Sequence, residues 1–343
     1  MINYDKCSVL FNRNQAEANR HAVRNELNIS RDTFEAKYLG LPTPKGRMIA
    51  NKFSPIQERL VKRCSTWNER FLSSAGKEVL IKSVAQAIPV YVMSVFLLPE
   101  AIQANLTRSV RRFWWGELGD KRKTHWIAWD KFTKPKGLGG LGFRDLKVFN
   151  QALLARQAWP LIDRPTSLCT RVLKARYYPN GCLLDITFSA NQSPTWRAIV
   201  HGLELVKKGF IWRIGSGEHT MIWRDPWIPR GASLRPIGKK QPCRLKWIAQ
   251  LIEYFWPHDV DQILNIRLPR VPVADFIAWH YEKTGVFTVK SAYMLAMEVL
   301  WNSTGNGQST SRNQGDRPIW KNYWRIPVPH KVLIFGWKVI HNG

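Results

Sequence analysis

Apolar residues recur at helical spacing through most of this chain, and this spacing constrains the fold more than any other feature. From Ser54 to Trp67, one face of a helix would collect four apolar side chains: Ile56, Leu60, Cys64 and Trp67. Ser54 can cap this helix, and Pro55 suits its first position. We therefore expect a stable amphipathic helix here, with its apolar face buried.

Other segments repeat this pattern together with signals for helix ends. Helices are expected from about Ala75 towards Pro89, from Pro99 to a glycine stop at Gly116, from Asp145 to Pro160, from Ser193 onward, and from Ser291 to Leu300. In the helix that begins at Pro99, the buried stripe would be Ile102, Leu106, Val110 and Phe113. Most of the folded chain should therefore be helical.

Alternating apolar residues, which are typical of strands, occupy only short stretches. Phe210–Ile214 and Met221–Trp223 flank a glycine turn and predict one hairpin, while Phe276–Val289 predicts a second. Trp126–Trp129 is a further strand candidate. The sequence thus predicts an α+β fold that is mainly helical, in which a basic helical subdomain precedes a region of mixed helices and β-hairpins.

Composition divides the chain into regions. We expect a first region at 1–50, the basic helical subdomain at 51–118, the mixed region at 119–301, and a flexible linker at 302–317 that is rich in Asn, Ser, Thr, Gly and Gln. Residues 318–343 are too few to enclose a core, so we expect the chain to stop within a domain.

The charge is strongly unbalanced, with 52 Lys and Arg against 25 Asp and Glu and a net charge of +27. Such an excess usually serves a polyanionic partner. Because 45% of the residues are hydrophobic and 17 are Trp, most of the chain should fold, which favours RNA, DNA or an RNA–DNA hybrid over a membrane surface. A protein that is merely basic is the plainer alternative.

Cysteine usage and the first residues bear on the compartment. The five cysteines are odd in number, and none forms a Cys-x-x-Cys pair, so neither a disulfide framework nor a metal site is expected. The N-terminus lacks the basic and apolar regions of a secretory signal, and no apolar run is long enough to span a bilayer. We expect an intracellular protein, nuclear or cytoplasmic, that is not secreted and needs no cofactor.

Ten residues are candidates for nucleic-acid contacts, because they place cations beside flexible backbone or aromatic rings. Arg59 and Arg63 would form a stripe beside the buried face of the first helix, with Lys62 pointing away from it. The others lie on the helix after Pro99 or around a glycine-rich loop: Arg108, Arg111, Arg112, Trp115, Lys134, Lys136 and Arg144. Core packing is the competing interpretation of Trp115.

The glycine-rich loop matches a dinucleotide-binding pattern, Gly-x-Gly-x-x-Gly, at Gly137–Gly142. That pattern requires a strand directly before it and a helix that starts at it, and neither is expected here. A flexible turn that approaches phosphates between flanking cations is the better interpretation. No catalytic motif is visible either, since the sequence lacks paired aspartates, a nucleophile elbow, His-Glu-x-x-His and a P-loop.

Several short segments, read in order, resemble the reverse transcriptases of plant LINE-type (non-LTR) retrotransposons. The resemblance spans Ile2 to about Trp337, and its segments are Ile2-Asn3-x-x-Lys6-Cys7, Tyr38-Leu39-Gly40-Leu41-Pro42, Lys136 to Asp145, Trp212 to Gly217, Trp223-Arg224-Asp225-Pro226-Trp227, Gly285 to Tyr293 and Trp324 to Val332. Each segment alone is weak, whereas their order is specific.

The resemblance implies a role for each region. It makes 1–50 the end of the palm with a primer-grip-like hairpin at Tyr38, Leu39 and Gly40, and 51–118 the thumb. Residues 119–301 become the connection, and 318–343 the start of a zinc-binding domain. The family's metal-binding carboxylates would precede Ile2 and its zinc ligands would follow Asn342, so this chain should hold a template and primer without reacting them. An active enzyme with its palm encoded upstream, or a host protein that reuses the fold, are the alternatives.

Overall fold

The computed structural model describes residues 7–9, 11–12, 14–29, 37–43, 48–117, 123–185, 188, 192–230, 233–237, 255–269, 271, 273–303 and 318–341. They form two compact units, an N-terminal unit that ends at Phe53 and a main unit that begins at Ser54. Ile2 to Lys6, Cys243 and most of the expected linker, residues 304–317, lie outside the described residues.

The N-terminal unit contains helix α1 (Glu17–Leu27), a two-stranded hairpin and a short 3-10 helix, η2 (Ala50–Phe53). Strand β1 (Lys37–Tyr38) pairs antiparallel with β2 (Leu41–Pro42), with Tyr38 opposite Leu41. The two turn residues, Leu39 and Gly40, both have positive φ angles, 51° and 77°. This is the geometry of the tight hairpin turns that match the twist of paired strands. A hairpin therefore lies where the primer grip is expected, and that role stays a prediction.

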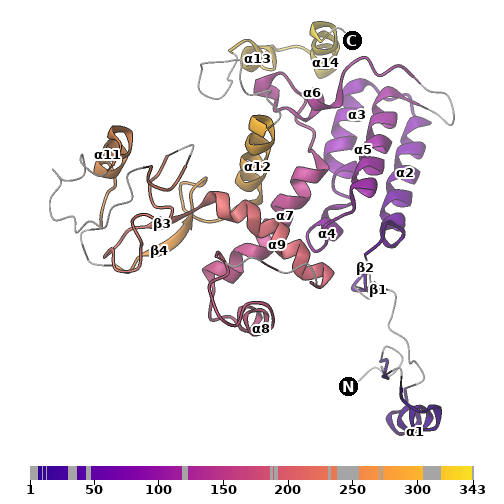
Figure 1. Cartoon of the computed structure of the whole chain (residues 1–343). Coiled ribbons are helices and arrows are strands. Elements are labelled where there is room, and N and C mark those ends of the chain that lie inside the picture. The colour runs from indigo at the N-terminus through magenta and orange to yellow at the C-terminus, as the bar shows by residue number, and fades with distance from the viewer. Residues whose placement is uncertain are drawn as a thin grey trace. The chain divides into compact units, whose positions relative to one another are not determined.

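The main unit begins with a bundle of helices, which run beside one another in Figure 1: α2 (Ser54–Asn68), α3 (Ser74–Leu80) and α5 (Glu100–Trp115). The helix expected from Ala75 towards Pro89 is present as α3, a π-helical turn η3 (Ile81–Ala85) and the short α4 (Val90–Met93). Gly116 ends α5 in the left-handed conformation, as expected. The predicted stripe of α5 is buried throughout, whereas on α2 Leu60, Cys64 and Trp67 are buried and Ile56 is half-buried.

The second half of this unit is built on the crossing of α7 (Leu146–Asp163) with α9 (Pro194–Gly209). At the crossing the two backbones touch, because a Cβ on Gly202 would lie 2.3 Å from the carbonyl carbon of Leu154. Helix α12 (Val289–Ser303) packs on both, and the core between the three holds Trp159, Leu203 and Trp279. Helix α7 is buried almost all round, which explains its apolar sequence.

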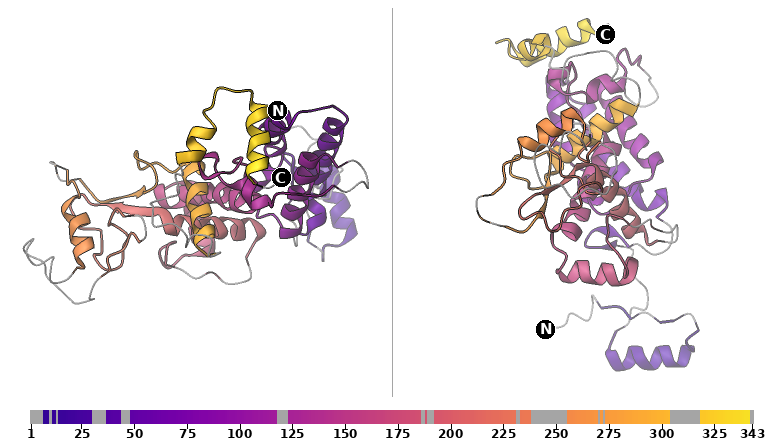
Figure 2. Two further views of the ribbon diagram at one scale, coloured as in Figure 1. Left: turned by 90° about the horizontal axis from the view of Figure 1, so that it is seen from above. Right: turned by 60° about the vertical axis from the view of Figure 1, so that its left-hand side comes forward.

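Smaller elements complete the unit: α6 (Trp129–Thr133), the 3-10 turn η4 (Lys136–Leu138), α8 (Leu168–Tyr177), β3 (Phe210–Arg213), α11 (Pro257–Leu264), β4 (Phe276–Trp279), α13 (Pro318–Tyr323) and α14 (His330–Ile340). Figure 2 shows from above the last two helices, in yellow, beside the helices of the first half of the unit. Helix α14 packs on α3, and α13 packs on η4.

The buried amide of Asn150 joins the two halves of the main unit. Its Nδ2 donates to the carbonyl oxygens of Met93 and Phe96 at 2.7 and 3.0 Å, and its Oδ1 accepts from the backbone N–H of Leu98 at 2.9 Å. An unpaired amide at this depth would cost free energy, so α7 and the chain around α4 are held in one arrangement.

The predicted fold class, α+β and mainly helical, is confirmed, but several local predictions are wrong. Trp126–Trp129 is not a strand: Ile127 is buried in an irregular segment, and α6 begins at Trp129. Helix α7 does not stop at Pro160, since the buried residues Trp159 and Leu161 hold the helix on both sides of it.

Both predicted hairpins pair differently. Strand β3 pairs antiparallel with β4, with Phe210 opposite Trp279, rather than with Met221–Trp223. The loop after β3 is instead held by Asp275, which directly precedes β4, so the pairing that forms is long-range. After the turn at Glu282–Gly285 the chain does not return as a strand, and α12 begins at Val289. Within the described ranges, no helix has both the length and the low polarity needed to cross a bilayer.

Candidate nucleic-acid interface

Helix α2 presents the clearest cationic surface of the predicted site. Arg59, Lys62 and Arg63 are all exposed, while Leu60 and Cys64 on the opposite side are buried against α5. Because the three cations are three and four positions apart, they share one face of the helix. This face, including Lys62, is exposed to solvent. Among the described residues, none of the three has an ion-pair partner, so their charges are available to an external anion.

Asn105 on α5 connects the cations of the two helices. Its Nδ2 donates to Gln57 Oε1 on α2 at 3.4 Å, and its Oδ1 accepts from Arg108 Nη1 at 2.9 Å. The Arg108 guanidinium is thus oriented by a side chain that also contacts α2. A planar guanidinium fixed on one edge keeps its other donors for a second acceptor such as a phosphate.

Arg108 and Arg111 line a groove of about 470 Å³ beside Trp129 and Lys147. Two carboxylates also line it, but both are engaged. Glu100 Oε1 lies 2.7 Å from Lys147 Nζ. Asp145 caps α7 by accepting from the backbone N–H of Val148 at 3.0 Å. Neither carboxylate neutralises the two arginines, so the groove retains positive charge.

The third arginine of α5 is used internally. Arg112 Nε lies 3.0 Å from Oε2 of the buried Glu117, and His125 Nε2 lies 2.7 Å from Glu117 Oε1. Arg111 Nη2 lies 3.2 Å from His125 Nδ1, and since arginine can only donate, Nδ1 accepts and Nε2 carries the proton that Glu117 accepts. Burial would raise the pKa of Glu117, but these hydrogen bonds hold its pKa below the ordinary value. Arg112 is therefore a structural partner of Glu117.

Trp115 is half-buried among its own neighbours, whereas Trp114 is fully in the core. The Trp115 ring stacks on His125 with centroids 5.7 Å apart and planes 15° apart, and Lys338 Nζ lies 5.7 Å from its centroid. A base that stacked on Trp115 would compete with these contacts. Base stacking at this ring stays a prediction.

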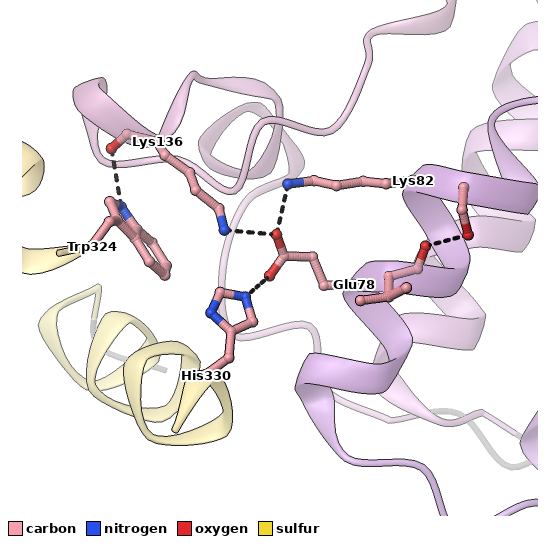
Figure 3. A network of polar contacts seen from close by, with 7 residues as sticks. Glu78, Lys82, Lys136, Trp324 and His330 are labelled. Carbon is pink, nitrogen blue, oxygen red and sulfur yellow. Dashed lines mark hydrogen bonds and ion pairs between the residues drawn. The ribbon is translucent and has the colours of Figure 1, made fainter. Parts of the chain in front are cut away.

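The C-terminal helices pack against the glycine-rich loop, and Figure 3 shows the contact between Lys136 of the loop and Trp324. Lys136 Nζ lies 3.0 Å from Glu78 Oε1 and 4.6 Å from the ring centroid of Trp324, and the Lys136 carbonyl accepts from Trp324 Nε1 at 3.1 Å. Gly139 approaches a further ring so closely that a Cβ there would lie 2.6 Å from Trp320 Nε1. Lys134 is half-buried, and only Arg144 of the three predicted loop cations is exposed.

Glu78 on α3 is the centre of this contact. Its buried carboxylate meets Lys82 Nζ at 2.6 Å, Lys136 Nζ at 3.0 Å and His330 Nε2 at 2.7 Å. Burial would raise the pKa of Glu78, yet the hydrogen bonds and charges of these partners hold its pKa below the ordinary value. The glycine-rich loop beside Glu78 is therefore a packing surface for α13 and α14. The sequence did not indicate this role.

Asp275 is a further buried carboxylate that the sequence interpretation missed. Asp275 Oδ1 accepts from the backbone N–H groups of Gly215 and Gly217 at 2.7 and 2.9 Å, and Oδ2 accepts from the His219 N–H and the Thr220 hydroxyl at 3.0 and 2.9 Å. Burial opposes ionisation, but these donors lower the pKa of Asp275 to about 2. A single aspartate among apolar residues was the only signal in the sequence.

The described part of the chain contains no group of three or more His, Cys, Asp or Glu side chains that could hold a metal ion. The glycine loop follows α6 and begins within a 3-10 turn, so no strand directly precedes it and it lacks the setting of a dinucleotide site.

Two plant proteins are similar to this chain, and no family model matches it. An uncharacterized mitochondrial protein of Arabidopsis thaliana is 43% identical over 153 residues, which are 44% of this chain and 99% of that protein. A protein of the same plant named "putative ribonuclease H protein" is 31% identical over 323 residues, or 87% of this chain. The chain covers 50% of the length of this second relative.

Proposed function

This chain belongs to the family of the Arabidopsis mitochondrial protein that it covers almost completely, and from this premise we propose that it binds nucleic acid without catalysing a reaction, as part of a LINE-type reverse transcriptase polyprotein. The single observation that carries the proposal is the exposed row of Arg59, Lys62 and Arg63 on α2, which no described carboxylate neutralises. Arg108 and Arg111 extend the charge onto α5.

The geometry favours contacts to phosphates rather than to base edges. Side chains on the outside of a packed helix bundle can follow a nucleic-acid backbone, but their spacing carries no sequence code. RNA, DNA and RNA–DNA hybrids should therefore all bind, with weak sequence preference and a steep dependence on salt.

The longer relative supports the context of this proposal, because it is named a putative ribonuclease H protein, and ribonuclease H is an enzyme that acts on nucleic acid. In this context α2, α3 and α5 serve as the thumb, and the hairpin at Tyr38–Gly40 serves as the primer grip. The region from α6 to α12 is the connection, and α13 and α14 begin the next domain.

The test compares salt dependence between matched variants. Replacing Arg59, Lys62 and Arg63 together by Gln should reduce the magnitude of the negative slope of log binding constant against log salt by about 1 to 3 units on an RNA–DNA hybrid, at about 0.9 per duplex phosphate contact. The measurement is fluorescence anisotropy over a salt series, with circular dichroism to establish that α2 still folds.

The control removes the same charge from α8, where three exposed cations lie apart from the proposed surface: Arg171, Lys174 and Arg176. Their replacement by Gln should leave the slope near that of the parent chain. Equal effects of the two triple variants would mean that net charge, rather than the surface of α2, accounts for binding.

A further inference from the structure

A pocket of about 510 Å³ lies beside the β3–β4 pair, apart from the α2 and α5 surface. One wall is β3 with Trp212 and Arg213, and the end of β4 adds Phe276. The segment after α11 forms another wall with Arg267 and Leu268.

The aromatic rings of the pocket are more exposed than core packing requires. Phe276 is 56% exposed, and Trp212 and Trp227, which also lines the pocket, are half-buried. The Trp227 ring is fixed, because its Nε1 donates to the Ile222 carbonyl at 2.8 Å. Large rings held at an open pocket provide flat apolar surfaces on which another planar group can stack.

The charge of the pocket selects an anion. Arg213 and Arg267 are exposed and line it, and none of its described lining residues is acidic. The nearest acidic side chain in sequence, Asp275, does not line the pocket, and both of its carboxylate oxygens accept hydrogen bonds from the loop that begins at Gly215. A ligand with a planar apolar part and an anionic part fits both properties.

We propose that this pocket binds single-stranded nucleic acid, with a base stacked on Phe276 and the adjoining phosphates held by Arg213 and Arg267. Base stacking on aromatic side chains tolerates any sequence, because every base has a π face. The inference rests on the proposed nucleic-acid function, but it adds a second site of different specificity. The surface on α2 follows the duplex backbone, and the pocket takes an unpaired strand.

The experiment uses two strands of equal length and charge, oligo(dT) and an abasic strand that has the phosphates but no bases. Phe276→Ala should weaken binding of oligo(dT) about fivefold or more, which corresponds to one stacked base, and leave the abasic strand unaffected. The double variant R213Q/R267Q should weaken both strands. Anisotropy measures affinity, and circular dichroism checks that each variant folds.

Two controls separate the pocket from general effects. Phe335→Ala removes a ring of similar exposure, 68%, on α14 and should change neither strand. The double variant R171Q/K174Q removes the same charge from α8 and should weaken binding less than R213Q/R267Q. The proposal is overturned if Phe276→Ala leaves oligo(dT) binding unchanged, or weakens both strands equally, while the fold is intact.

Failure of the pocket proposal can be distinguished from failure of the proposed function. If the α2 triple variant keeps the parent salt slope on the hybrid while Phe276→Ala still selectively weakens oligo(dT), the pocket stands and the phosphate surface is wrong. If the parent chain binds neither the two strands nor the hybrid, both proposals fail together.

Discussion

His330 Nε2 lies 2.7 Å from Glu78 Oε2, and this contact ties the first turn of α14 to α3, although 252 positions separate the two residues in the sequence. Lys82 and Lys136 share the other carboxylate oxygen, so one buried glutamate joins α3, the glycine loop and the last helix. The position of α13 and α14 therefore depends on a charge in the predicted thumb.

Replacing Glu78 by Gln should lower the free energy of unfolding by about 1 to 3 kcal/mol, because it removes the charge and turns one acceptor into a donor that faces other donors. Because the pKa of Glu78 is lowered in the folded protein, its stabilisation is complete above the ordinary value of 4.5 and is lost as the pH falls through the lower folded value. The difference between parent and variant in urea unfolding should therefore shrink at acid pH.

Glu204→Gln is the matched control for this prediction. Glu204 pairs with Lys207 at 3.1 Å on the surface of α9, and its side chain is 55% exposed. Exposed pairs of this kind contribute at most about 1 kcal/mol. An equal loss in both variants, or a Glu78→Gln deficit that does not change with pH, would contradict the role assigned to Glu78.

Gly202→Ala should destabilise the main unit by about 2 to 3 kcal/mol, the upper range for overpacking, since its Cβ would meet the backbone of α7 rather than a movable side chain. Gly76 provides the opposite case. A Cβ there would meet only ordinary contacts at 3.7 Å, so Gly76→Ala should stabilise by about 0.4 to 1 kcal/mol. Urea unfolding measures the change in the free energy of unfolding of each variant. A Gly202→Ala variant as stable as the parent chain would refute the close crossing of α7 and α9.

Asp275→Asn should destabilise the loop after β3 by about 1.5 to 3 kcal/mol, because the amide nitrogen would face two of the four donors that the carboxylate accepts. The ordinary aspartate pKa of 3.8 falls to about 2 here, so the stabilisation persists down to pH 3.8 and is lost only towards pH 2. Hydrogen exchange at Gly215, Gly217 and His219 reports the loss directly.

The exposed Asp261 on α11 is the control, and Asp261→Asn should change stability by less than about 0.5 kcal/mol. Unchanged exchange at Gly215 and Gly217 in Asp275→Asn would show that the loop is held by something other than this carboxylate.

Local patterns predicted what local forces decide. The caps at Ser193 and Asp145, the glycine stop at Gly116 and the apolar stripes of α2 and α5 could all be read from the sequence, because each depends on residues within a turn or two. The helices begin and end close to the expected residues for that reason.

Long-range contacts could not be read in the same way. The pairing of β3 with β4 and the docking of α13 and α14 depend on Asp275 and Glu78, which meet partners far away in the chain. For the candidate site, the sequence identified the cations but not their use. Only the structure separates Arg59 and Arg63, which have no ion-pair partner among the described residues, from Arg112 and Lys136, which pair with buried glutamates.

Lysine footprinting tests the central claim, that α2 contacts a nucleic-acid backbone, most directly. An amine-reactive reagent is applied with and without a bound RNA–DNA hybrid, and mass spectrometry gives the modification rate of each lysine. Lys62 on α2 should react more slowly in the complex, Lys174 on α8 should react equally in both, and Lys136 should react slowly in both because Glu78 holds it. Equal reactivity of Lys62 in the free and bound chain, under conditions where anisotropy shows saturated binding, would contradict the account.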